Sequence, residues 1–251
     1  MSSRYTYRTN RRIMADTDLA LPPSAFSIPS TATDPLTGNI INYWSLGPEF
    51  RGITNQIVLA QFDENRSRYH GIDFNFDRRF DGRWMMRLSL TLQDNQGRVG
   101  GFMNRNDMEI FPEGAVGFDA RHLFRALGTY ILPADVNFGW AFRSTGGMNS
   151  FTGGDSMART VQVRDVTTNS LYNVRVEPNG SYRQDPVNVL DLRASKVFRI
   201  NGHRLEAMID AFNVLNANNV LQASTITGPT FDRPTHVLPA RVARLGFKYT
   251  F

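Results

Sequence analysis

The four histidines, His70, His122, His203 and His236, are the side chains best suited to bind a metal or to move a proton, but they lie far apart and lack metal-ligand spacing. The chain contains no cysteine, which removes disulfides, thiol catalysis and cysteine-based metal sites. G-x-S-x-G, P-loop and dinucleotide-binding motifs are also missing from the sequence. We therefore predict that the protein is not an enzyme and that it uses neither a cofactor nor a metal.

Carboxylates and arginines recur at alternating positions of the extended segments. The acids are Asp73, Asp77, Asp191, Glu206 and Asp210, and the arginines are Arg87, Arg143, Arg193 and Arg199. Because alternate residues of a strand share one face, both sets are expected on the same side of a sheet. They could form a charged path for a solute or a docking surface for another domain. They could also form cross-strand ion pairs that neutralise a water-facing wall, which is the interpretation we favour.

Two further groups of side chains lie in the long connections. Oxygen-bearing residues that could bind calcium, without EF-hand spacing, are Asp16, Asp18, Asp63, Glu64, Asn104 and Asp107. Aromatic residues that could contact a ligand or anchor the loops are Tyr43, Trp44, Phe102, Phe111 and Phe151. The sequence does not choose between these two roles for the aromatic residues.

The formal net charge of the chain is +5, and arginine supplies most of the positive charge. Its dense basic cluster is Arg4, Arg8, Arg11 and Arg12. Elsewhere the arginines are spread at alternate positions along strands, which argues against a nucleic-acid groove. We therefore expect no nucleic-acid partner.

Strict alternation of apolar and polar residues predicts about eight long strands. Their ranges are 3–14, 69–79, 83–93, 121–132, 136–144, 187–200, 204–216 and 241–251. Each is about ten residues long, the length of a tilted membrane-spanning strand. A strand pair in a soluble sandwich would show the same alternation, so strand length and the sidedness of the loops decide between the two.

The connections alternate between short and long. Short turns are expected at residues 133–135 and 201–202, and a two-residue hairpin turn is expected at Asp81-Gly82. Long connections are residues 15–66, 94–119, 145–186 and 217–239, in which we predict a hairpin of 39–45 with 56–61 and another of 159–165 with 171–176. Aromatic residues expected beside the short turns are Phe80, Trp84, Tyr130, Phe138, Phe198, Tyr249 and Phe251. This layout is typical of outer-membrane barrels, with short periplasmic turns, long extracellular loops and an interfacial aromatic girdle.

The last strand carries a further pattern, formed by Arg244, Gly246, Tyr249 and Phe251. It resembles the C-terminal signal by which bacterial outer-membrane barrels are recognised by the barrel-assembly machinery. We expect residues 241–251 to present an open edge or to pair only with residues 204–216.

From about residue 69 onward, the chain resembles the C-terminal part of TonB-dependent outer-membrane receptors, in particular the Oar-like group. The matching stretches are YHGIDFNFDRRFDGRW (69–84), YILP (130–133), NVLDLRASKVF (188–198), DAFNVLN (210–216), GPTFDRP (228–234) and PARVARLGFKYTF (239–251). The stretch at 212–216 and the ending are the most specific of these. Their order along the chain makes the match strong.

This resemblance implies an all-β, antiparallel up-and-down transmembrane barrel of about 22 strands, plugged by an N-terminal domain. Residues 1–251 are then expected to be a single C-terminal barrel segment, with the plug domain and the signal peptide absent. The implied location is the bacterial outer membrane, and the implied role is import of a bulky solute of the siderophore, vitamin, oligosaccharide or peptide class. The implied partners are membrane lipid, that unidentified solute, and the TonB energy-coupling protein, which would act through the plug. The alternative is a non-transporting surface or adhesive barrel, or an inactive remnant.

Overall fold

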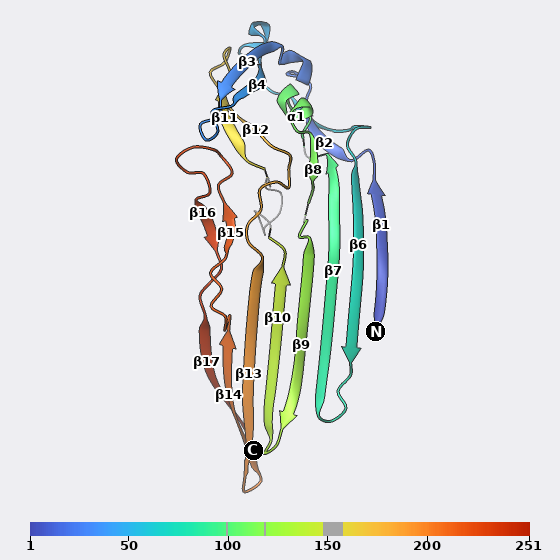
Figure 1. Ribbon diagram of the computed structural model, residues 1–251, viewed down its shortest axis with the longest axis vertical. Coiled ribbons are helices and arrows are strands. Elements are labelled where there is room, and N and C mark those ends of the chain that lie inside the picture. The colour runs from blue at the N-terminus through green and yellow to red at the C-terminus, as the bar shows by residue number, and fades with distance from the viewer. Residues whose placement is uncertain (99, 118, 148–157) are drawn as a thin grey trace.

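The computed structural model describes residues 1–98, 100–117, 119–147 and 158–251. In these residues, eight long strands run side by side in one sheet, and shorter elements gather beyond one end of it (Figure 1). The long strands are β1 (Ser2–Asn10), β6 (Ser67–Arg78), β7 (Trp84–Arg98), β9 (His122–Leu132), β10 (Val136–Thr145), β13 (Val187–Ile200), β14 (His203–Phe212) and β17 (Val242–Thr250). The predicted all-β, antiparallel up-and-down fold is confirmed.

The strands follow the order β1-β6-β7-β9-β10-β13-β14-β17, and the short strand β8 (Glu113–Ala115) pairs with the outer end of β7. Each neighbouring pair is antiparallel. Within the described residues, β1 pairs only with β6 and β17 pairs only with β14, so the sheet is open at both edges. The expectation that residues 241–251 pair only with the preceding long strand is therefore confirmed.

The register gives the sheet one apolar and one polar face. Pairs on the apolar face include Phe74 with Leu90, Trp140 with Leu192, and Ala207 with Phe247. Pairs on the polar face include Asp77 with Arg87, Arg193 with Asp210, and Asp210 with Arg244. Successive side chains of a strand point to opposite faces, so a shift of one residue in any strand would place its polar residues on the apolar face. The pairs above show no such shift.

Short turns join the strands at one rim, and the C-terminus lies at that same rim (Figure 1). Ile200 pairs with His203 across a two-residue turn, where Asn201 and Gly202 have φ of 49° and 83°, as the prediction required. The short turn at residues 133–135 is also confirmed, because Leu132 pairs with Val136.

The two-residue turn predicted at Asp81-Gly82 is wrong. The last pair of that hairpin is Arg78 with Met86, so the connection is longer. Of the two predicted positions, Gly82 alone has a positive φ, of 91°. Instead, the Asp81 carboxylate accepts hydrogen bonds from the backbone N–H groups of Arg83 and Trp84, each at 3.2 Å, which stabilises a wider Asx-type turn.

Aromatic residues gather beside these turns, as predicted. Trp84 of β7 pairs with Tyr130 of β9, and Tyr130 pairs with Phe138 of β10. Nearer the β17 edge of the sheet and on the same face, Leu205 pairs with both Phe198 and Tyr249. The apolar face therefore ends in a row of aromatic rings at the short-turn rim.

The long connections contain small hairpins and short helices. Antiparallel pairs are β2 (Met14–Asp18) with β5 (Ile57–Gln61), β3 (Ile28–Thr33) with β4 (Ile40–Ser45), β11 (Thr160–Arg164) with β12 (Leu171–Arg175), and β15 (Val220–Ala223) with β16 (Pro234–Val237). The helices are η1 (Pro23–Ala25), η2 (Pro48–Phe50) and α1 (Arg105–Glu109). None of the helices in the described ranges is long and apolar enough to cross a membrane.

Two predictions about the first connection are corrected. The first strand, expected at residues 3–14, divides into β1 and β2. The hairpin of 39–45 with 56–61 is wrong, because β4 pairs with β3 and β5 pairs with β2. The turn before β4 explains the choice: Asp34 accepts hydrogen bonds from Leu36 N and Thr37 Oγ1, and Gly38 supplies a φ of 74°. The hairpin predicted at 159–165 and 171–176 is confirmed as β11 and β12.

We use the name loop cap for the assembly of β2 to β5, η1, η2, α1, β11 and β12. It has its own hydrophobic core, in which Ile41 and Tyr43 of β4 pack with Val161, Val163 and Val174 of β11 and β12. A second cluster joins Ala25, Phe26 and Leu46. The loop cap is therefore a packed structure with its own interior.

Candidate functional site

Three of the five acids singled out on the polar face, Asp77, Asp191 and Asp210, form the cross-strand ion pairs favoured from the sequence. The other two do not, because Asp73 accepts a hydrogen bond from Thr91 Oγ1 at 2.6 Å and Glu206 lies 3.8 Å from Arg204 of its own strand. Arg87 lies 2.9 Å from Asp77, and Arg143 lies 3.7 Å from Asp191. Asp210, whose side chain is 8% exposed, contacts Arg244 at 2.8 Å and Arg193 at 3.6 Å. The arginine partners are at least half exposed, so each of these pairs contributes little to stability. Their role is to balance the charge of a wet surface.

The predicted assembly-signal residues occupy both faces of β17. On the polar face, Arg244 binds Asp210 through Nε and Nη2, and Gly246 faces Met208. On the apolar face, Tyr249 is 58% exposed and its hydroxyl lies 2.9 Å from His203 Nδ1. Phe251 is 95% exposed. This places Tyr249 and Phe251 on an uncovered surface at the short-turn rim, while their role as a recognition signal stays a prediction.

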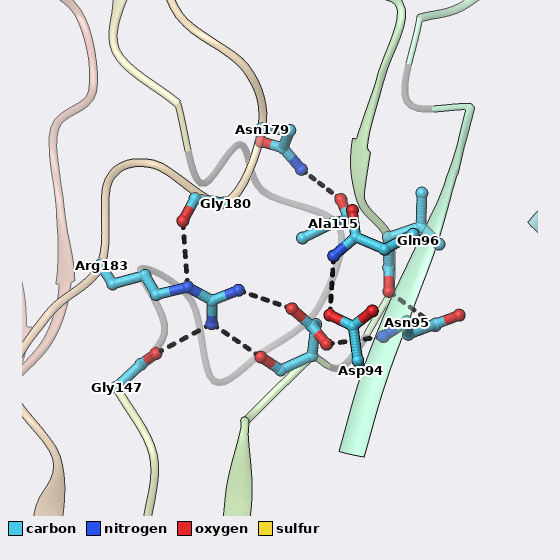
Figure 2. Close-up of polar contacts among 10 residues, drawn as sticks. Asp94, Asn95, Gln96, Ala115, Gly147, Asn179, Gly180 and Arg183 are labelled. Atoms are coloured by element: carbon cyan, nitrogen blue, oxygen red, sulfur yellow. Dashed lines mark hydrogen bonds and ion pairs between the residues drawn. The ribbon is translucent and has the colours of Figure 1, made fainter. Parts of the chain in front are cut away.

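A buried ion pair joins Arg183 of the third long connection to Asp119, which ends the second long connection. Figure 2 shows the hydrogen bonds around Arg183. Arg183 Nη2 donates to the Asp119 carboxylate at 2.5 Å, and the Asp119 side chain is fully buried. Arg183 also donates to the carbonyl oxygens of Gly180 at 3.0 Å and Gly147 at 3.3 Å. Asp119 Oδ1 accepts from the backbone N–H of Asn95 at 2.9 Å. One charge pair thus ties together segments that are widely separated in the sequence.

A second buried pair lies in the loop cap, between Asp34 and Arg159 at 2.7 Å. Burial acts to raise the pKa of Asp34, but hydrogen bonds from Leu36 and Thr37, together with Arg159, lower it to about 2. Arg159 also donates to Thr227 at 3.2 Å, which reaches the fourth long connection.

The buried carboxylate of Asp165 joins the end of β4 to the turn between β11 and β12 through backbone hydrogen bonds. It is 1% exposed and accepts hydrogen bonds from Leu46 N at 2.7 Å, Thr168 N at 2.8 Å and Thr167 N at 2.9 Å. Burial acts to raise the pKa of Asp165, and these backbone N–H groups bring it below its usual value. Asp165 is therefore an anionic anchor of the cap.

Most of the aromatic residues singled out in the loops act as anchors. Tyr43 donates to the Arg164 carbonyl at 2.7 Å, and the Trp44 backbone exchanges hydrogen bonds with the Asn106 side chain at 2.7 and 2.8 Å. Phe102 is 1% exposed and stacks on Phe62 at 3.7 Å. The remaining two differ, because Phe111 is 40% exposed and Phe151 lies outside the described residues.

The predicted calcium-binding residues do not form one cluster, although Asn104 hydrogen-bonds to Asp107 and borders the same cavity as Asp18. Asp63 forms an exposed pair with Arg12 at 2.6 Å, while Asp16 and Glu64 are exposed. Asn104 caps α1 by accepting from Asp107 N at 2.9 Å. Throughout the described ranges, no group of three histidine or acidic side chains could hold a metal ion. Three of the histidines make separate contacts, His70 with Tyr5, His203 with Tyr249, and His122 with Ser144.

The cavity of most chemical interest lies inside the loop cap and has a volume of about 340 Å³. Its lining comes from β2, η1, η2, the segment before α1, and the β11–β12 hairpin. The apolar and aromatic lining residues are Leu21, Phe26, Leu46, Phe50, Ile53, Met103 and Tyr172. The polar ones are Asp18, Asn55, Asn104, Thr168 and Ser170, so Asp18 is its charged side chain. The sequence named Asp18 and Asn104 as loop oxygen ligands but gave no sign that they border one cavity.

A larger cavity of about 550 Å³ lies at the outer end of β1 and β6. Arg11, Arg66 and Arg68 line it, together with Asp63 and Glu113, and Arg66 pairs with Glu113 at 3.2 Å. Its lining crosses the sheet from β1 to β7, because Thr9 pairs with Arg68 and Arg68 pairs with Gln96.

No protein-family model and no curated protein matches the chain. Solved structures that are similar to it include YddB and FpvA. The outer membrane transporter YddB from Escherichia coli matches with a TM-score of 0.47 and 12% identity, over 98% of this chain and 29% of that one. FpvA of P. aeruginosa, bound to heterologous pyoverdines, matches with a TM-score of 0.43 and 11% identity, over 78% of this chain and 21% of that one. This chain therefore spans less than a third of the length of either structure.

Proposed function

We propose that residues 1–251 form the C-terminal wall segment of a TonB-dependent outer-membrane receptor that imports a bulky solute. The observation that carries this proposal is the sidedness of the sheet. It has one continuous apolar face, one polar face with paired charges, short turns at one rim and a packed loop cap at the other. This is the layout that a wall between lipid and water requires.

The exposed apolar surface supports a lipid environment. On β17, Leu245 is 71% exposed, Phe247 is 74% exposed and Tyr249 is 58% exposed. A surface of this kind is an aggregation hazard in water, whereas the hydrocarbon of a membrane solvates it. In this proposal the bacterial outer membrane covers the apolar face, and the aromatic row at the short-turn rim lies at the periplasmic interface.

The open edges support a larger barrel. In a closed barrel every edge strand finds a partner, and the free edges of β1 and β17 would pair with further strands of the receptor. The sequence resemblance supplies the finer parts of the proposal: the Oar-like group, a barrel of about 22 strands, and a plug that contacts the TonB energy-coupling protein. The barrel-assembly machinery would read Arg244, Gly246, Tyr249 and Phe251.

Solute depletion tests the proposal. Cells with and without the gene are incubated with a mixture of one ferric siderophore, cobalamin, a maltooligosaccharide series and an oligopeptide library, with and without a functional energy-coupling protein. The proposal predicts that the gene accelerates loss of one component from the medium, and only when energy coupling is intact. Equal depletion in all strains, or depletion that survives loss of coupling, would contradict it and favour a surface or adhesive barrel.

A further inference from the structure

The cavity of the loop cap is bordered by the buried carboxylate of Asp18, which uses only one of its two oxygens as a hydrogen-bond acceptor among the described residues. Asp18 is 3% exposed. Its Oδ1 accepts hydrogen bonds from Ala20 N at 2.9 Å, Leu21 N at 3.1 Å and Gln56 N at 2.9 Å. Burial acts to raise the pKa of Asp18, but these backbone N–H groups bring it below its usual value, so the group is ionised at neutral pH.

The second oxygen of this carboxylate has no hydrogen-bond or ion-pair partner among the described residues. Across the described residues, Oδ2 takes part in none of the hydrogen bonds or ion pairs of Asp18, which all involve Oδ1. In the described ranges, the side-chain polar atoms that are shielded from solvent and also lack a partner are Arg98 Nε and Arg175 Nη2. Oδ2 of Asp18 is not among them, although it lacks a partner in those ranges. It therefore keeps contact with solvent, and Asp18 is one of the residues that line the cavity.

The rest of the lining defines which cation could enter. Phe26, Phe50 and Tyr172 present aromatic rings, which attract a cation and also cover an apolar body. Burial raises the pKa of Tyr172 to about 12, so its hydroxyl stays neutral. The hydroxyl groups of Thr168 and Ser170 can accept further N–H donors. A volume of about 340 Å³ is near the lower end for ligand sites and suits one ring or a short chain.

We propose that this cavity binds a primary ammonium group on a short apolar or aromatic body, with Asp18 Oδ2 as the counter-ion. An anion would face the unpaired carboxylate, and a neutral apolar group would displace solvent from that charge without replacing its hydrogen bonds. The inference rests on the proposed function and deepens it, because it assigns the imported solute to a class that presents a free amine.

The test uses the full-length protein in detergent and three probes of matched shape. These are 4-fluorophenethylamine, which is a cation, 2-(4-fluorophenyl)ethanol, which is neutral, and 4-fluorophenylacetate, which is an anion. Binding is followed by fluorine NMR line broadening. The cation should bind about tenfold more tightly than the alcohol, the margin expected when a charged hydrogen-bond partner replaces a neutral one. The anion should show no binding.

Two variants separate the carboxylate from its surroundings. Asp18→Asn keeps an oxygen that can accept the three backbone N–H groups but removes the charge, so the preference for the amine over the alcohol should disappear. Asp16→Asn makes the same change at an exposed position on the same strand, and it should leave all three affinities unchanged. An equal affinity for amine and alcohol in the unmodified protein, or a preference that persists in Asp18→Asn, would overturn the inference.

A labelling experiment keeps the inference testable if Asp18→Asn fails to fold. Ser170→Cys places the sole cysteine of the chain in the cavity lining. The amine should slow its reaction with a maleimide while the alcohol does not, and equal protection by both would count against the site. Failure of this inference is distinguishable from failure of the proposed function. Amine binding without import removes the transport role, whereas coupled import of a solute, with no amine bound at Asp18, removes only the amine site.

Discussion

Removal of the Asp119 carboxylate should loosen the third long connection far more than removal of an exposed acid. In Asp119→Ala the Arg183 guanidinium, whose side chain is 17% exposed, loses the partner that lies 2.5 Å away. The backbone N–H of Asn95 loses its acceptor as well. Breaking a buried pair by removing one partner typically costs about 3–5 kcal/mol, because an uncompensated charge stays behind.

The lower end of this range applies here. Arg183 keeps hydrogen bonds to the carbonyl oxygens of Gly180 and Gly147, which continue to satisfy part of its charge. We therefore expect about 3 kcal/mol, which corresponds to about a 150-fold increase in the population of the open connection. A matched control is Asp63→Ala, because Asp63 and Arg12 form an ion pair of 2.6 Å whose side chains are 76% and 69% exposed. An exposed pair of this kind contributes about 1 kcal/mol or less.

Hydrogen exchange measures the difference. Amides of residues 179–185 should exchange about 150-fold faster in Asp119→Ala than in the unmodified protein, since exchange follows the local opening equilibrium. The same amides should change little in Asp63→Ala. If the two variants gave the same exchange rates, the buried pair would not be what holds this connection, and the reasoning would be refuted.

Three further outcomes follow from the structure. Because the pKa of Asp34 is lowered from 3.8 to about 2, its stabilisation of the cap is complete above the ordinary value and is lost as the pH falls toward 2; near-UV circular dichroism should show this acid transition, and Asp34→Asn should weaken it. Gly202→Val should lower stability by about 1–2 kcal/mol, because a φ of 83° is unfavourable for a residue with a Cβ. Gly139→Ala is the control: its added Cβ would have its nearest neighbour at 3.8 Å, so the change should be nearly neutral. A heat-modifiability assay compares the two variants. Phe247→Arg should destabilise the membrane-inserted protein by about 2–4 kcal/mol in a denaturant titration, and a loss no larger than that of Lys248→Arg would contradict a lipid-facing position.

Strand positions and faces were predictable because they follow from local periodicity. The range 187–200 coincides with β13, and the turn at Asn201-Gly202 has the φ values that its sequence requires. The Asp81-Gly82 turn failed because a side chain competed with the backbone: Asp81 binds two N–H groups and widens the turn. Dipeptide signals do not report this competition.

Apart from the β11–β12 hairpin, the loop cap was not predictable from local pattern. Its pairings depend on contacts such as Tyr43 with Arg164 and Leu46 with Asp165, which join residues more than a hundred positions apart. The same holds for the cavity, since Asp18, Met103 and Tyr172 come from different connections. The sequence did contain one indication of buried acids, since Asp18 and Asp165 lie in apolar or turn-rich surroundings. It did not indicate which other segments these acids would contact.

The most direct measurement is the collision accessibility of nitroxide spin labels on β7 of the full-length protein in lipid bilayers. Residues 1–251 contain no cysteine, so once any cysteine elsewhere in the full-length protein is replaced, single labels can be placed at Leu88 and Leu90 on the apolar face and at Ser89 and Thr91 on the polar face. The labels at Leu88 and Leu90 should collide often with oxygen, which dissolves in lipid, and rarely with a water-soluble nickel chelate, while the other two should show the reverse. Exclusion of both reagents at Leu88 and Leu90, as in a packed protein core, or free access of the nickel chelate there, would contradict a membrane-spanning wall.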